Sequence, residues 1–404
     1  MKMKIKLLAV SVFALTVLSI SLYPLDGEWN VNAKNVIKGI NQNTVHAQQQ
    51  NKIEVVFVLD TTGSMSGLIQ AAKEKIWSIA TSMASAESSP EIKVGLVAYR
   101  DRGDAYVTKT VGLSHDLDSV YSKLMDFKAN GGGDGPESVN KALFDAVNNI
   151  SWSQGKGVYK VVFLVGDAPP HMDYKGEAQY PEIVQMAHDK GIVINAIQSG
   201  NNQSTRKQWM HMASLGQGEY FQVGQSGNAV AVHTPYDKKM AVLSKKLDDT
   251  RIYYGTKQER EKQSAKVKAT DKMHAKSSLA TRARRAEFNM QKSGKLNRLG
   301  KNELVDDVAS GRISLDSLDE DKLPASIQAL PKPQQLKLIK EKAKLRSGLL
   351  KEIKDLSGKR KQYINAEVKK TGAAEASLDE KIYKTVRQQA AKKGLEYKED
   401  SAAY

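Results

Sequence analysis

The feature that most constrains this chain is a regular alternation of short apolar runs and longer amphipathic stretches, which begins at residue 53. Residues Ile53–Leu59 are apolar except for Glu54, as is typical of a parallel strand buried on both faces. Gly67–Ala84 then repeats apolar residues at helical spacing. Further strands are predicted at Ile92–Tyr99, Tyr106–Leu113, Val158–Val165, Ile192–Ile197 and Tyr220–Val223, and helices at Asp118–Lys128, Glu137–Asn149, Pro181–Lys190, Thr205–Ser214 and Ala229–Leu247. This order predicts an α/β fold with a doubly wound, mostly parallel sheet.

The N-terminus has the composition of an export signal. Lys2, Lys4 and Lys6 precede an uncharged, mainly apolar stretch from Leu7 to Leu25. Small residues that suit a signal peptidase follow, so residues 1–47 are predicted to be a signal peptide. An uncleaved anchor is the alternative, because about 19 apolar residues approach the length of a membrane span. Either way we expect an exported chain, periplasmic or extracellular, since the lysines stay inside.

Charge and composition mark a boundary in the chain. Residues 251–404 carry 36 lysines and arginines against 21 acidic residues, whereas the first 250 residues carry 25 and 24. A hydrophobic content of 40% and a charged content of 26% are those of a globular protein. We therefore expect a nearly neutral α/β domain at residues 51–250, followed by a basic, mainly α-helical C-terminal region. With no cysteine, disulfides and thiolate sites are excluded.

The basic region divides into two predicted parts. Residues 256–322 have the composition of a helical linker, with the cluster Arg282-Ala283-Arg284-Arg285, and residues 334–397 are predicted to form a helical or coiled-coil region. The apolar stripe behind that prediction comprises Leu336, Ile339, Ala343, Leu349, Ile353, Leu356 and Tyr363. Arg346, Gly348 and Gly358 interrupt it. The basic charge indicates solvated helix faces or binding to an anionic surface, and the missing aromatic interleaving disfavours nucleic acid.

Three loops with unusual residues are expected at one edge of the sheet. The loop after the first strand reads Asp60-Thr61-Thr62-Gly63-Ser64, and a second reads Gly131-Gly132-Gly133-Asp134-Gly135-Pro136-Glu137. The third follows the strand Val158–Val165 and reads Gly166-Asp167-Ala168-Pro169-Pro170-His171. In open parallel sheets, ligands bind at the carboxyl ends of the strands. Carboxylates and hydroxyls there are hard oxygen donors suited to one divalent cation, Mg²⁺, Ca²⁺ or Mn²⁺.

These motifs resemble the von Willebrand A family, over about residues 51–250. The metal-ion-dependent adhesion site of that family uses Asp-x-Ser/Thr-x-Ser, a second-loop Thr and a third-loop Asp. Asp60, Thr62 and Ser64 match the first motif and Asp167 the third. The residue pattern of these loops is closer to that of an exported bacterial branch, similar to the A domains attached to alpha-kinases and those of hemicentin type. The resemblance implies that these residues hold a divalent cation.

The second loop departs from the family pattern, since it has no threonine at the expected place. Asp134 is the first choice for that position, because Gly133 and Gly135 allow close approach of the backbone, and Glu137 is the alternative. His171 is expected on the rim, because the other donors are hard oxygens. Asp101 is expected either to support a ligand or to pair with Arg100 or Arg102.

Three functions follow from this reading. The first is an exported, metal-dependent module that binds a protein or cell-envelope ligand at the loop edge, with the C-terminal helices available for oligomerisation. The second is a structural or assembly protein whose metal is purely structural and whose basic tail binds. A remote third is an aspartyl-phosphate phosphotransferase built on Asp60. The motifs of other enzyme classes are missing, so we expect a non-enzyme.

Overall fold

The computed structural model describes residues 51–67, 69–133, 135–155, 157–224, 232–371 and 378–397. All of them belong to one compact unit that spans Gln50–Tyr404. The predicted signal peptide, residues 1–47, lies outside the described residues. Within the described part of the chain, no helix combines the length and the apolar character needed to cross a membrane.

Six strands form one sheet in the order β3-β2-β1-β4-β5-β6. Their bounds are β1 (Lys52–Asp60), β2 (Glu91–Tyr99), β3 (Thr108–Ser114), β4 (Val158–Gly166), β5 (Ile192–Ser199) and β6 (Gln217–Val223). Only β3 is antiparallel to its neighbour, and the other four pairings are parallel. The predicted mostly parallel α/β sheet is therefore confirmed. Because β1 is central, Asp60 at its carboxyl end lies in the middle of the sheet edge.

Helices cover both faces of the sheet. One core joins alternate residues of β1, such as Val55 and Phe57, to α3 (Ile69–Ala84) and α4 (Leu117–Leu124). The other core joins Val56 and Val58 to α5 (Val139–Phe144), α6 (Tyr180–Asp189) and α7 (Gln203–Leu215). This two-sided burial is why the sequence of β1 reads as a nearly continuous apolar run.

The helical region spans residues 232–371 and is built around one long helix, α14 (Lys332–Thr371). The other helices are α8 (Asp237–Asp248), α9 (Lys257–Lys276), α10 (Leu279–Met290), α11 (Lys295–Leu299), α12 (Leu304–Ala309) and α13 (Ala325–Gln328). Leu349, Ile353 and Leu356 of α14 pack against α8 and α10, while Ile339 packs near α12 and α13. Most of the predicted apolar stripe is thus covered within the chain, although Leu336 is exposed.

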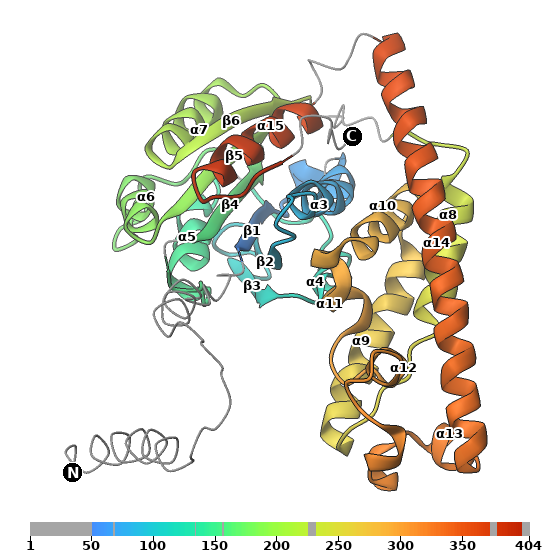
Figure 1. The fold of residues 1–404 in the computed structure, drawn as a ribbon. Coiled ribbons are helices and arrows are strands. Elements are labelled where there is room, and N and C mark those ends of the chain that lie inside the picture. The colour runs from blue at the N-terminus through green and yellow to red at the C-terminus, as the bar shows by residue number, and fades with distance from the viewer. Residues whose placement is uncertain are drawn as a thin grey trace, which may run out of the picture. The chain divides into compact units, whose positions relative to one another are not determined.

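The last helix, α15 (Leu378–Ala391), returns to the sheet, and this differs from the predicted grouping of residues 334–397. Figure 1 shows α15 beside β5 and β6, far along the sequence from both. Ile382, Val386 and Ala390 lie in the same core as β1 and α3. Gln389 accepts a hydrogen bond from the Tyr159 hydroxyl at 2.6 Å. The α/β domain therefore consists of two stretches of chain, with the helical region between them.

The predicted basic cluster is partly buried rather than solvated. Arg285 is fully buried and donates through Nε and Nη2 to both oxygens of Asp118, each at 2.6 Å. Its Nη1 lies 2.8 Å from an oxygen of Asp248. Since Asp118 belongs to α4 and Asp248 to α8, this arginine joins the α/β domain to the helical region. Arg284 is also buried.

Candidate metal centre

The first and third loops bring their polar side chains together at the carboxyl end of β1. Thr62 Oγ1 donates to Asp60 Oδ1 at 2.6 Å, and the Thr62 backbone N–H donates to the same oxygen at 2.8 Å. Ser64 Oγ lies 3.2 Å from Thr62 Oγ1 and donates to Asp167 Oδ1 at 3.0 Å. Hydrogen bonds thus connect the side-chain oxygens of the four residues that match the sequence motif.

The second loop contributes Glu137, which is 3% exposed. The backbone N–H of Glu137 donates to the carbonyl of Pro169, so this residue is tied to the third loop. A Cβ at Gly132, where φ is +74°, would lie 3.0 Å from Glu137 Oε1 and 3.3 Å from Thr62 Cβ. The absence of a side chain there lets the Glu137 carboxylate approach the first loop. Asp134, the first choice from the sequence, lies outside the described residues.

Gly166 has no side chain, and this lets the side chains of Tyr99 and Asp60 approach the backbone of the third loop. A Cβ there would lie 2.5 Å from the Tyr99 hydroxyl and 2.9 Å from Asp60 Oδ2. Asp60 Oδ2, Glu137 Oε2 and the Tyr99 hydroxyl are all buried without a hydrogen-bond partner. Buried polar atoms in folded proteins nearly always have a partner. The unpartnered carboxylate oxygens of Asp60 and Glu137, together with the hydroxyls of Thr62 and Ser64, are the kind of donor set expected of a cation site.

The carboxyl groups of the site perturb one another. Burial raises the pKa of Asp60 to about 7, against the opposing effect of the hydrogen bonds from Thr62. Burial, together with the negative charges of Asp60, Asp101, Asp104 and Asp167, raises the pKa of Glu137 to about 9. Burial also raises the pKa of Asp167. Burial and mutual repulsion thus favour the protonated forms of these carboxyl groups, whereas a bound cation would favour their ionised forms.

Asp101 forms a second cluster next to the first, and neither of its neighbouring arginines pairs with it as the sequence had suggested. Arg100 donates to the backbone carbonyls of Thr61 and Lys128, and Arg102 forms an ion pair with Glu177. Asp101 instead accepts hydrogen bonds from Ser138 at 2.7 Å and from Tyr174 at 2.8 Å. Ser138 is adjacent to Glu137 in the chain, so Asp101 supports the segment that carries this carboxylate.

His171 belongs to the Asp101 cluster. Its Nε2 lies 3.3 Å from Asp101 Oδ2, its Nδ1 lies 2.8 Å from Asp173 Oδ1, and its ring stacks on Tyr174 at 3.9 Å between centroids. The side chain is buried, whereas the sequence suggested a place on the rim. Its neighbours are thus Asp101, Asp173 and Tyr174 rather than the hydroxyls of the first loop.

Three residues of the site were not singled out from the sequence. Tyr99 pairs with Asp60 in the β1–β2 register, which places its hydroxyl in the site. Asp104 accepts from the backbone N–H groups of Asp101 and Gly132 and so connects two loops. Thr205 donates to the backbone carbonyl of Asp167 at 3.0 Å. Tyr99 was predictable, because the ends of adjacent parallel strands share an edge, but nothing in the local sequence marks Asp104 or Thr205.

Among the described residues, no group of three or more histidine, cysteine and acidic side chains is arranged to hold a metal ion. The donors at this edge are a mixture of carboxylates and hydroxyls, which Asp60, Thr62, Ser64, Glu137 and Asp167 supply. Such a set suits a hard cation that also takes water or a ligand oxygen. With its backbone N–H bonded to Asp60, the Thr62 hydroxyl is held in place by the turn itself.

Comparison with known proteins identifies the domain. The family model described as "von Willebrand factor A domain" matches residues 54–235. A putative ariadne-like RING finger protein of Acanthamoeba polyphaga mimivirus is 28% identical over 125 residues, which are 30% of this chain and 12% of that protein. An alpha-protein kinase of Dictyostelium discoideum is 28% identical over 120 residues, which are 30% of this chain and 19% of that protein. The similarity thus covers under a fifth of either relative.

A von Willebrand factor type A protein from Catenulispora acidiphila superposes with a TM-score of 0.34 at 16% identity, covering 43% of this chain and 39% of that one. Domains of this family commonly bind a divalent metal and mediate protein interactions. The family match, the sheet topology and the loop edge lead to one conclusion: residues 54–235 of this chain are a von Willebrand factor A domain.

Proposed function

We propose that this is an exported protein of a bacterial branch of the family, and that its von Willebrand A domain holds one divalent cation and binds a protein or cell-envelope ligand there. Asp60, Thr62, Ser64, Asp167 and Glu137 would hold the ion, with Asp134 as the alternative to Glu137. The observation that carries the proposal is the pair of buried, unpartnered oxygens, Asp60 Oδ2 and Glu137 Oε2. When bound, the ion supplies a positive centre that attracts a ligand carboxylate. We further propose that the chain is not an enzyme.

The negative charge of the carboxylates around the ion favours a second candidate function, in which the ion only stabilises the loops. Asp60, Glu137 and Asp167 would give a doubly charged cation up to three negative charges, which leaves no net positive charge for an incoming carboxylate. In that case the helical region would carry the binding surface. The two candidates differ in whether a carboxylate ligand binds only when the metal is present.

The metal itself is tested by calorimetric titration of Mg²⁺, Mn²⁺ and Ca²⁺ into the full chain. The full chain is needed because α15 completes the core of the domain. We expect one site, lost in Asp60→Asn and retained in Glu182→Gln, an exposed acid on α6. Loss in Glu137→Gln but not in Asp134→Asn assigns the second loop to Glu137, and the reverse assigns it to Asp134. No binding at millimolar ion would overturn the metal site.

The role of the metal is tested with an immobilised glutamate-containing peptide as probe. The adhesion mechanism predicts binding in Mg²⁺ that is abolished by a chelator and in Asp60→Asn. Metal binding without any metal-dependent peptide binding favours the structural ion. Turnover of p-nitrophenyl phosphate that requires Asp60 would contradict the non-enzyme proposal and favour the phosphotransferase alternative.

A further inference from the structure

A cavity unrelated to the loop edge lies where the α/β domain meets the helical region. It has a volume of about 480 Å³ and is lined by residues of α3, α10 and α14 and by the residues that directly follow α3 and α10. Small-molecule sites in proteins span about 300–1,000 Å³. The cavity is therefore large enough for a small organic molecule and not only for a single ion.

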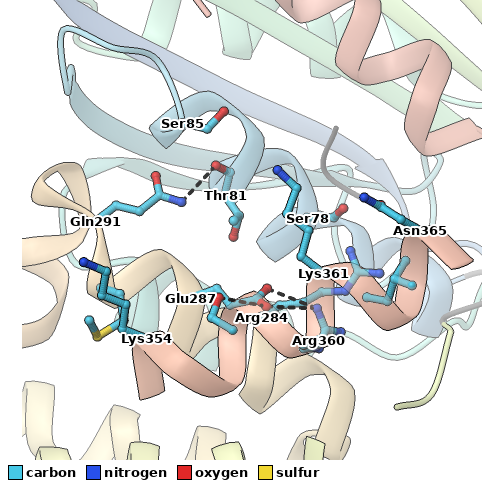
Figure 2. Close-up of a pocket in the computed structure, with 13 residues that line it drawn as sticks. Ser78, Thr81, Ser85, Arg284, Glu287, Gln291, Lys354, Arg360, Lys361 and Asn365 are labelled. Atoms are coloured by element: carbon cyan, nitrogen blue, oxygen red, sulfur yellow. Dashed lines mark hydrogen bonds and ion pairs between the residues drawn. The ribbon is translucent and has the colours of Figure 1, made fainter. Parts of the chain in front are cut away.

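The wall made by α10 and α14 is strongly cationic. Arg284, Lys354, Arg360 and Lys361 line the cavity with a single carboxylate, Glu287, so the lining carries an excess of three positive charges. Figure 2 shows Arg284, Glu287 and Arg360 close together on this wall. Both arginines are buried, whereas Lys354 and Lys361 are exposed, so the cavity has an open side. This arrangement favours an anionic ligand.

The guanidinium of Arg360 interacts with other residues of the chain through only some of its nitrogens. Its Nε donates to Asp237 Oδ1 at 2.8 Å, and its Nη1 lies 3.1 Å from Glu287 Oε2. Its Nη2 is buried without a hydrogen-bond partner. Two fixed carboxylates thus orient the guanidinium while one nitrogen with two N–H donors is left for another acceptor. A phosphate oxygen is such an acceptor.

Other polar atoms, on residues that line the cavity, also lack partners. They are Thr81 Oγ1, Gln291 Oε1 and Asn365 Oδ1, all buried. Figure 2 shows Ser78 and Thr81 of α3, and Ser85 just after this helix, opposite the charged wall. The two amide oxygens accept hydrogen bonds, and ligand hydroxyl groups would supply the donors. The cavity therefore combines anion recognition with hydroxyl recognition.

We propose that this cavity binds a small phosphorylated polyol, such as a sugar phosphate or glycerol phosphate. The phosphate is held by Arg360, Arg284 and the two lysines, and the hydroxyl groups by Thr81, Gln291 and Asn365. A ligand there contacts both α3 and the helices α10 and α14, so it stabilises the junction of the two parts of the chain. The proposal is independent of the metal site.

The test is calorimetric titration of the full chain with glycerol 3-phosphate, glucose 6-phosphate, inorganic phosphate and glycerol. We expect saturable binding of at least one ester, tighter than inorganic phosphate, and no binding of glycerol. Lys354→Ala/Lys361→Ala should weaken the binding of each ester that binds by about ten-fold, since two charge-assisted contacts are lost. The matched control is Lys351→Ala/Lys359→Ala, which removes two exposed lysines of α14 outside the cavity and should leave affinity unchanged.

A second variant separates the two kinds of recognition. Thr81→Val removes a hydroxyl while keeping the shape of the side chain, so it should weaken ester binding and leave inorganic phosphate unaffected. Asp60→Asn should change neither. Vesicles that contain phosphatidic acid distinguish a lipid headgroup from a free ester, because binding lost in the cavity variant but not in its control assigns the phosphate to lipid.

Three outcomes would overturn the proposal. The first is no saturable binding of either ester at about 10 mM, a range in which even weak sites are detected. The second is equal affinity for inorganic phosphate and the esters. The third is equal loss of binding in the cavity variant and the matched control, which would assign the effect to the general charge of α14.

Discussion

At the scale of single residues, Gly166 illustrates how closely the loop edge is packed. It precedes Asp167, and an added Cβ would overlap the Tyr99 hydroxyl and the Asp60 carboxylate. We expect Gly166→Ala to destabilise the fold by about 1–3 kcal/mol through overpacking and to abolish metal binding by displacing Asp60. Urea unfolding and metal titration measure the two effects.

The matched control for this prediction is Gly112→Ala in β3, where an added Cβ meets nothing within 4 Å. It should change stability by less than about 1 kcal/mol and leave metal binding intact. Full metal affinity in Gly166→Ala would mean that the Asp60 carboxylate tolerates displacement, which would contradict its assigned role.

Asp118 predicts a pH dependence of stability. Burial alone would raise its pKa, but the charge and hydrogen bonds of Arg285 outweigh burial and hold the pKa at about 2, below the ordinary 3.8. A depressed pKa contributes stability above about pH 4, and that contribution, about 2 kcal/mol, is lost as pH falls toward 2. Asp118→Asn should cost about 3–5 kcal/mol at pH 7, because it leaves a buried arginine with less countercharge.

Urea unfolding of both proteins between pH 7 and the lowest pH at which they fold measures this difference. The stability gap between wild type and Asp118→Asn should narrow below pH 4. A gap that stays constant over the whole range would show that the Asp118 carboxylate does not titrate with the expected depressed pKa. Asp355→Asn, at an exposed site on α14, serves as the control.

Many residues of the loop edge could be predicted from the sequence, but not all of them. Asp60, Thr62, Ser64 and Asp167 were predictable, because each follows a strand whose carboxyl end lies at the same sheet edge. The choice between Asp134 and Glu137 depends on the path of a glycine-rich loop, and glycine places few restraints on that path. Asp104 acts through backbone N–H groups of other loops, a role that leaves no sequence pattern.

At the scale of elements, α15 is held to the sheet by Gln389, which bonds Tyr159 of β4 and Asn195 of β5. Gln389→Leu should destabilise the fold by about 1–3 kcal/mol, because it leaves buried polar atoms unpaired. Gln388→Leu, one residue earlier and exposed, should change stability by less than about 0.5 kcal/mol. Equal effects of the two substitutions in thermal unfolding would contradict the buried network.

The helix α14 shows why periodicity alone does not identify a partner. Its apolar stripe is equally suited to a coiled coil or to packing against helices of the same chain. Arg346, which interrupts the stripe, is buried and forms a two-fold ion pair with Glu303 at 2.7 and 2.9 Å. Arg346 is thus part of the packing of α14, because a carboxylate far away in the sequence neutralises its charge.

At the scale of the whole molecule, the contacts between the two parts predict cooperative unfolding. Trp77 of α3 packs edge-on against Phe288 of α10 at 5.8 Å between centroids, and Arg285 joins α4 to α8. Tryptophan fluorescence, which reports Trp77 and Trp209 of the α/β domain, and far-UV circular dichroism, to which the helical region contributes, should therefore show one coincident urea transition. Separate transitions in the wild-type background would show that the helical region unfolds independently.

The same contacts explain a limit of sequence reasoning. The order of strands and helices predicted the sheet, and the change in charge near residue 250 predicted a different kind of region beyond it. The return of α15 was not predictable, because its amphipathic pattern is that of any helix lying on an apolar surface. Which surface it covers is decided by tertiary packing over more than 150 residues of intervening sequence.

The discontinuous α/β domain has a consequence for how the chain is made. Synthesis proceeds from the N-terminus, and domains generally fold as units once they are complete. The strand β1 shares its core with α15, which is synthesised after β1 and after the whole helical region. The core that these two elements share therefore cannot be completed on the ribosome until α15 has emerged. A chain that crosses a membrane in an unfolded state would gain from this delay, because the core of its α/β domain cannot be completed early.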